Sequence, residues 1–122
     1  MKDNLIILGI KKSDIPKLQK YLSTKNKKII FPDVFARKFQ LDKISTKKIL
    51  IFLLEQNIIS FLYRVKVDSY YWDYKTLADI PKVIDIDDRL IEDVLERTYI
   101  LFEVVNKNDL WNSSKFFKRS CK

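Results

Sequence analysis

The chain has 122 residues, of which 47% are apolar and 33% charged, a balance that favours one packed domain and excludes a disordered chain. A single Cys and the absence of His exclude an internal disulfide and leave no imidazole for catalysis or metal binding, so we expect neither an enzyme nor a cofactor. The longest uninterrupted apolar run, 49–54, is far shorter than a membrane span, and we expect a cytoplasmic protein.

Positive charge is concentrated towards the two ends of the sequence. Residues 1–50 hold 13 Lys and Arg against 4 Asp and Glu, residues 51–109 hold 7 against 12, and residues 110–122 hold 4 against none. A basic segment of this kind is typical of a protein that binds nucleic acid or an acidic partner. An AT-rich coding sequence also enriches Lys, and here Lys outnumbers Arg by 19 to 5, although phosphate and base contacts favour Arg. Charge therefore leaves both interpretations open.

The N-terminal part of the sequence predicts a short segment and then a helix. We expect residues 4–10 to form a short strand or a buried segment. Ser13 or Asp14 is a suitable cap for a helix that has Pro16 in its first turn and ends near Ser23. The apolar residues of this helix share one stripe and are Ile15, Leu18, Tyr21 and Leu22.

Two further helices are predicted beyond a basic connection at 24–30. The first starts after Pro32, and its inward-facing residues are expected to be Val34, Phe35, Ala36 and Phe39. A turn at 40–44 leads to the second, which we expect to begin at a Ser45 cap and to end near Gln56. Its apolar stripe consists of Ile49, Phe52 and Leu53, widened by Leu50 and Leu54. Asn57 stands where a left-handed residue usually ends a helix.

The C-terminal half predicts strands and one more helix. An alternating strand at 58–67 places Ile59, Phe61, Tyr63, Val65 and Val67 on one face. A turn at 68–69 leads to a second strand at 70–74, and a helical turn at 76–80 is stopped by Pro81. Asp87 or Asp88 is then expected to cap a helix, followed by a strand at 98–105. One long helix over 88–106 is the alternative. The inward-facing residues of this helix would be Leu90, Ile91, Val94 and Leu95.

The segment 32–67 resembles the winged helix-turn-helix superfamily, and the letters FARKFQLDKISTKKILIFLLEQNIISFLYRV carry the resemblance. Ala36 stands at the small position where two helices cross. The residues similar to the buried turn of the family are Phe39, Leu41 and Ile44. The letters EQNII at 55–59, followed by an alternating strand, are similar to the usual entry into the wing. Gln40 and Asn57 stand where the family often has Gly.

The resemblance implies an α+β fold in a single domain, 1–122. Its parts would be a winged-helix core at 13–67, a β/α extension at 68–106 and a basic aromatic tail at 107–122. The extension, VKVDSYYWDYKTLADIPKVIDID, also resembles the zinc-ribbon-like hairpin that follows the wing in small prokaryotic winged-helix proteins. It contains no Cys or His, so a structural zinc site is excluded there. Packing of Tyr70, Tyr71 and Trp72 would replace the metal.

In the winged-helix superfamily the second helix of the motif enters the major groove of DNA. The resemblance therefore implies that the first turns of the helix beginning near Ser45 face DNA. The residues concerned are Lys43, Ser45, Thr46, Lys47 and Lys48. Arg37 and Lys38 on the preceding helix would contact phosphates, and Arg64 and Lys66 on the wing would reach the backbone. A solvated lysine surface is the alternative.

A protein partner is the second hypothesis, in which the domain is an adaptor or accessory subunit of a larger prokaryotic complex. The helix from Ser45 to Gln56 is apolar on all sides, so Ile51 is either covered or part of an interface. The aromatic residues expected at such an interface are Tyr70, Tyr71 and Trp72 in the extension and Trp111, Phe116 and Phe117 in the tail. A basic segment beside an acidic one also permits self-association.

Overall fold

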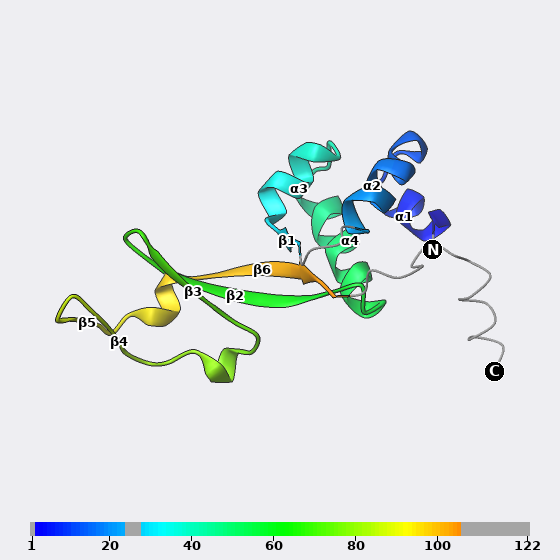
Figure 1. Ribbon diagram of the computed structural model, residues 1–122. Helices are drawn as coiled ribbons and strands as arrows, with labels where there is room; N and C mark the ends of the chain where they lie inside the picture. The colour runs from blue at the N-terminus through cyan, green and yellow to red at the C-terminus, as the bar shows by residue number, and fades with distance from the viewer. Residues whose placement is uncertain (1, 24–27, 106–122) are drawn as a thin grey trace, which may run out of the picture. The chain divides into compact units, whose positions relative to one another are not determined.

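The computed structural model describes residues 2–23 and 28–105, which form an α+β fold of helices and a mostly antiparallel sheet (Figure 1). Two compact units divide the chain. The first comprises Met1–Ser60 with Glu103–Lys122, and the second comprises Phe61–Phe102. The expected domain organisation, one domain with a core ending at residue 67, differs from this division. Among the residues described, no helix is long and apolar enough to cross a membrane.

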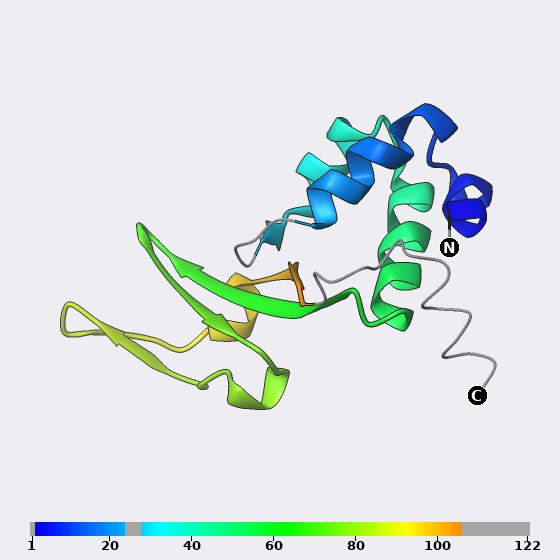
Figure 2. The ribbon, with the colours of Figure 1, turned by 45° about the vertical axis from the view of Figure 1, so that its right-hand side comes forward.

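Helices dominate the described part of the first unit. They are α1 (Lys2–Leu8), α2 (Ile15–Leu22), α3 (Pro32–Lys38) and α4 (Lys43–Glu55), with a 3-10 turn, η1 (Lys12–Asp14), before α2. Both α1 and α3 pack against α4, which therefore lies inside the helical group (Figures 1 and 2). Of the two alternatives for 4–10, the strand is wrong, because residues 4–8 belong to α1, and only Leu5 and Ile10 of this segment are buried. A helix buries one face of this apolar run and leaves Ile7 81% exposed.

The predicted stripe of α2 is confirmed, since all four of its residues are buried. Its Tyr21 ring contacts the rings of Phe35 in α3 and of Phe39 directly after α3, with centroids 5.8 and 5.7 Å away. Phe35 and Phe39 are fully buried, as predicted, and their own centroids are 4.9 Å apart. Val34 was expected to face inward and is instead 45% exposed. Phe35 and Phe39 lie one turn apart on the buried face of this two-turn helix, and Val34 falls outside it.

Three helices of the first unit end in the same way. After α1, α3 and α4 the backbone takes positive φ values, of 124° at Gly9, 53° at Gln40 and 60° at Asn57. At each end the following residue donates its N–H to a carbonyl five residues earlier, as Ile58 does to Leu53 at 3.0 Å. This is the Schellman arrangement, which satisfies carbonyls that the helix leaves free. The predicted left-handed end at Asn57 is confirmed.

The beginning of α4 differs from the prediction. Asp42, and not Ser45, is the cap, and its side chain accepts a hydrogen bond from the Ser45 N–H at 2.6 Å. The helix therefore begins at Lys43, and Lys47 and Lys48 lie in its second turn. Asp and Ser are both good caps, so the local sequence permits either start. The hydrogen bonds from Ser45 are the main reason that the pKa of Asp42 is lowered.

Short strands join the two ends of the first unit. Strand β1 (Ile29–Ile30) lies beside the end of β6 (Thr98–Val104), where the Val104 N–H donates to the Lys28 carbonyl at 2.9 Å. Strand β2 (Ile59–Val67) follows α4, and the order in the sheet is β1-β6-β2-β3. The face predicted for β2 is partly wrong. Phe61 is 42% exposed, whereas Leu62 is buried.

Hairpins form most of the second unit. Strand β2 pairs antiparallel with β3 (Tyr70–Tyr74), with Val67 opposite Tyr70, as the two-residue turn predicted. The helix expected after Asp87 or Asp88 is wrong. These residues instead take φ values of 51° and 62° in the turn between β4 (Ile84–Ile86) and β5 (Arg89–Ile91). Two consecutive positive φ values suit a tight hairpin, and Asp tolerates them better than most residues.

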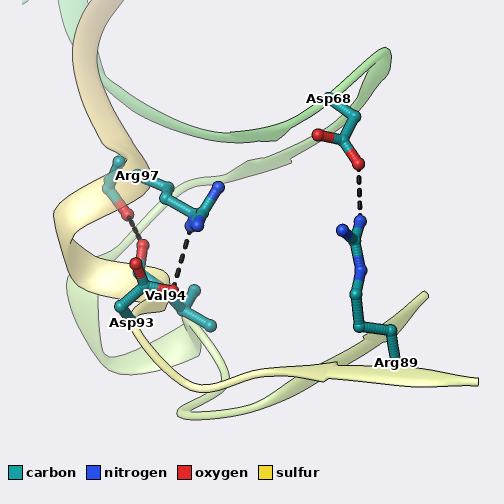
Figure 3. A network of polar contacts seen from close by, with 6 residues as sticks. Asp68, Arg89, Asp93, Val94 and Arg97 are labelled. Atoms are coloured by element: carbon teal, nitrogen blue, oxygen red, sulfur yellow. Dashed lines mark hydrogen bonds and ion pairs between the residues drawn. The ribbon is translucent and has the colours of Figure 1, made fainter.

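The second unit has its own aliphatic core. Its buried residues are Val65, Val67, Ile80, Ile84, Ile86, Ile91 and Val94, with Tyr63, Trp72 and Tyr74 packed against them. Ion pairs lie on its surface, where Arg89 donates to Asp68 at 2.5 Å and Arg97 to Asp93 at 3.0 Å (Figure 3). A 3-10 turn, η3 (Val94–Arg97), leads into the predicted strand at 98–105, which is present as β6.

We predict that the left-handed residue after α4 contributes measurably to stability. Replacing Asn57 with Ala should lower the free energy of unfolding by about 1 kcal/mol, because a Cβ without a polar side chain is disfavoured at positive φ. The matched change, Asn57→Gly, should leave stability equal or slightly higher. Urea unfolding followed by circular dichroism measures both variants. An equal loss of stability in both variants would show that the positive φ at residue 57 is not the cause.

The cap of α4 should make stability depend on pH. The pKa of Asp42 is below its ordinary value of 3.8, so its ionised form stabilises the folded state above that value, and the effect fades as pH falls through the lowered pKa. Asp42→Ala should lower the melting temperature by several degrees at pH 7, whereas Asp42→Asn should lower it less. The difference in melting temperature between the wild type and Asp42→Asn should become smaller in acid. A difference in melting temperature that stays constant between pH 7 and pH 2 would show that the carboxylate charge of Asp42 contributes nothing to stability.

Candidate nucleic-acid interface

Among the described residues, one face of α4 is exposed, whereas α1 and α3 pack against this helix elsewhere. Its inward-facing residues, Ile49, Leu50 and Leu53, are buried. The exposed residues lie three, four and seven positions apart, which places them along one side of a helix. We call this side the α4 face, and its residues are Lys43, Ile44, Lys47, Lys48 and Ile51, followed one turn later, at the end of the helix, by the exposed Glu55. The structure thus keeps three of the lysines that the resemblance assigned to DNA on one accessible surface.

Two other residues assigned to DNA are turned away from this face. Thr46 is only 6% exposed, and its hydroxyl donates to the Asp42 carbonyl at 2.7 Å. Its expected contact with DNA is wrong, because the hydroxyl is used inside the first turn of α4. Ser45 lies against the end of α1, where a Cβ added to Gly9 would come within 3.1 Å of the Ser45 Oγ. Ser45 is therefore close to the α1–α4 packing contact.

Within residues 2–23 and 28–105, no carboxylate neutralises the lysines of the α4 face. Of the described carboxylates, none forms an ion pair with Lys43, Lys47 or Lys48. Asp42 is the nearest acidic group in sequence, and Lys48 contributes to its lowered pKa, but its carboxylate is occupied by Ser45. Unpaired cations close together on a helix raise the local positive potential. Such a surface attracts a polyanion.

A second group of cations lies over the aromatic contacts between α2 and α3. The Nζ of Lys28 is 4.0 Å from the centroid of the Tyr21 ring, and the Nζ of Lys38 is 5.5 Å from the same centroid. The Nζ of Lys17 is 5.5 Å from the Phe39 centroid and donates to the Lys38 carbonyl at 3.0 Å. We call Lys17, Lys28 and Lys38 the Tyr21 cluster. These cation–π contacts orient the ammonium groups.

Sequence reasoning assigned Lys38 and Arg37 to phosphates but missed Lys17 and Lys28. Arg37 is exposed in the last turn of α3, next to Lys38. Lys17 lies over Phe39, which is far from it in sequence, so no local pattern predicts that contact. No local pattern connects Lys28 with Tyr21, because tertiary packing brings them together. Lys11 was also missed, and its Nζ donates to the Gln40 Oε1 in the turn before α4.

The two residues assigned to the wing, Arg64 and Lys66, belong to the second unit and differ in their contacts. Arg64 is held by Asp73 through two hydrogen bonds, of 2.8 and 3.1 Å, and its guanidinium lies 4.1 Å from the Tyr71 ring centroid. The bonds with Asp73 are the main reason that the pKa of Arg64 is raised. This pairing neutralises Arg64, and we leave it out of the candidate interface. Lys66 is exposed on β2.

The residues assigned to a protein partner divide into surface and core positions. Ile51 is 46% exposed on the α4 face, and Tyr70 and Tyr71 are 46% and 56% exposed. Of the three aromatic residues expected to pack together in the extension, Trp72 is the one that packs against the aliphatic core of the second unit. Tyr70 stacks on Trp72, with centroids 6.3 Å apart. The remaining assigned residues, Trp111, Phe116 and Phe117, lie outside the described residues.

Comparison with models of protein families, with curated proteins and with solved structures finds no match to this chain.

Proposed function

We propose that this protein binds duplex DNA mainly through phosphate contacts from the α4 face. The observation that carries the proposal is the set of exposed lysines on that face, Lys43, Lys47 and Lys48, which have no ion-pair partner among the described residues. An ammonium group that replaces a condensed counterion at a DNA phosphate releases that counterion, and this release drives binding. Three such contacts give log K a slope of about −3 against log salt concentration.

The order of elements supports a winged-helix interpretation of the first unit. The chain runs α2, β1, α3, α4, β2 and later β6, and β6 lies between β1 and β2 in the sheet. By the resemblance of residues 32–67 to the winged-helix superfamily, the second helix of the motif is the recognition helix. Under this proposal α4 is that helix. The β3–η3 segment is an enlarged wing inserted between β2 and β6.

The Tyr21 cluster supplies further phosphate contacts under the same proposal. Lys38 lies in the last turn of α3 and Lys43 in the first turn of α4, so cations stand on both sides of the turn at Gln40. Lysine is a compact point charge that holds a phosphate without reading a base. Binding through these groups is therefore strong at low salt and weakly dependent on sequence.

A second candidate function is that of an adaptor that binds protein through the second unit. The observation that favours it is the exposed apolar surface on that unit, where Tyr71, Leu77 and Leu90 are 56%, 58% and 62% exposed. Unlike the first unit, residues 61–102 hold more acidic than basic residues. Sedimentation velocity of the pure protein separates the candidates. Stable self-association with no duplex binding at low salt would favour the adaptor.

We expect the double substitution Lys47→Glu with Lys48→Glu to abolish duplex binding. Each change removes one counterion-releasing contact and places an anion beside the phosphates. Both side chains are exposed, so unfolding free energies should change by no more than about 0.5 kcal/mol per site. Fluorescence anisotropy with a labelled duplex at 50 and 200 mM salt measures the effect.

The matched control carries the same charge change at exposed lysines outside α4, Lys2→Glu with Lys82→Glu. This variant should keep most of the affinity, since only the long-range potential changes. Equal loss of affinity in both double variants would show that net charge alone, and not the α4 face, determines binding. An unfolded Lys47/Lys48 variant would contradict the assignment of these residues to the free side of the helix.

The Tyr21 cluster should contribute to the salt dependence. Lys17→Ala with Lys38→Ala should make the slope of log K against log salt less steep by about two, because each lysine that contacts a phosphate accounts for about one. Lys17 also donates to a carbonyl at the end of α3, so a purely structural role is the alternative. Thermal unfolding distinguishes the two. Lower stability with an unchanged slope would remove the cluster from the interface.

A further inference from the structure

Two isoleucines of α4 are exposed, although the other apolar residues of this helix are buried or half-buried. Ile44 is 67% exposed and Ile51 is 46% exposed, and both belong to the α4 face with the lysines that no described carboxylate pairs. They are seven residues apart, which is about 10 Å along the helix axis. This distance corresponds to roughly three base-pair steps of 3.4 Å in a duplex. The two side chains are therefore spaced to reach separate base pairs.

The charge around these isoleucines indicates what covers them. An exposed apolar pair on a helix also suits a protein interface, but an apolar protein surface would have to desolvate Lys43, Lys47 and Lys48 without supplying carboxylates. The major groove of DNA offers both kinds of contact at once. Phosphates line its rim, and the 5-methyl groups of thymine lie on its floor. The alternation of isoleucine and lysine on the α4 face matches that arrangement.

The composition of α4 limits which base contacts are available. From Lys43 to Glu55 the helix contains no Arg, Asn or Gln, the side chains that form paired hydrogen bonds with guanine or adenine. Thr46 is buried, and Ser45 lies against the end of α1. A lysine contact with guanine is still available. The contact that Ile44 and Ile51 themselves can make with a base is apolar, with the thymine methyl.

We infer that Ile44 and Ile51 contact thymine methyl groups and make the α4 face prefer A·T base pairs. The inference rests on the proposed binding of duplex DNA. It adds a determinant of sequence preference to a surface that otherwise holds phosphates. Each methyl group that is buried against an isoleucine should strengthen binding about fourfold, the value expected for one buried methylene-sized group.

The test compares two duplexes that differ only in this methyl group. One is an alternating A·T duplex, and the other has every thymine replaced by deoxyuridine, which lacks the 5-methyl. The wild-type protein should bind the thymine duplex more tightly, by about fourfold if one isoleucine contacts a methyl and about fifteenfold if both do. The variant Ile44→Ala with Ile51→Ala should bind both duplexes equally. The control Ile7→Ala, at an exposed isoleucine of α1, should keep the wild-type ratio.

Each outcome has a separate meaning. Equal wild-type affinity for the two duplexes, with binding intact, would overturn this inference and leave the proposed function standing. No binding to either duplex at low salt would overturn the proposed function and the inference with it. Sedimentation velocity of the same proteins gives a further check. A loss of self-association in the Ile44/Ile51 variant, with an unchanged thymine-to-deoxyuridine ratio, would assign the isoleucines to a contact between copies of the chain.

Discussion

Burial of α4 is the constraint on which the helical unit depends. Ile49 and Leu53 are fully buried, and α1 and α3 both pack against this helix. A helix that is apolar on nearly all sides must be covered on most of them, because exposed apolar area is costly. Within the part of the chain that the structure describes, this packing leaves the α4 face exposed. The packing of α1 and α3 on α4 therefore determines which lysines and isoleucines of α4 are exposed. These exposed residues form the proposed interface.

The two units use their cations differently. In the second unit Arg64 and Arg97 lie against carboxylates at hydrogen-bond distance, which neutralises them and stabilises hairpins and turns. In the first unit the lysines of the α4 face are unpaired among the described residues, and those of the Tyr21 cluster lie on aromatic rings. An arginine fork suits a fixed carboxylate, whereas a mobile lysine suits a phosphate whose position varies. This difference is consistent with DNA binding by the first unit.

Features that depend on near neighbours in the chain could be predicted from the sequence. The buried stripe of α2 follows from helical spacing, and the end of α4 at Asn57 follows from the tolerance of Asn for positive φ. The β2–β3 hairpin follows from alternation around a two-residue turn. The exposure of Lys47 and Lys48 follows from the core positions on the same helix. Each of these depends on residues within about two helical turns or one hairpin.

Tertiary packing decided what local pattern left open. A short apolar run suits a strand as well as a helix, and the 4–10 run became α1 because α4 offered a helical face to cover. Leu90 and Val94 have helical spacing, but they follow a hairpin turn whose aliphatic neighbours complete a separate core. Lys28 meets Tyr21 only when β1 and α2 are folded together. Rules based on hydrophobic periodicity and helix capping apply to one segment at a time. Which residues become buried depends on all the segments that pack into the same core.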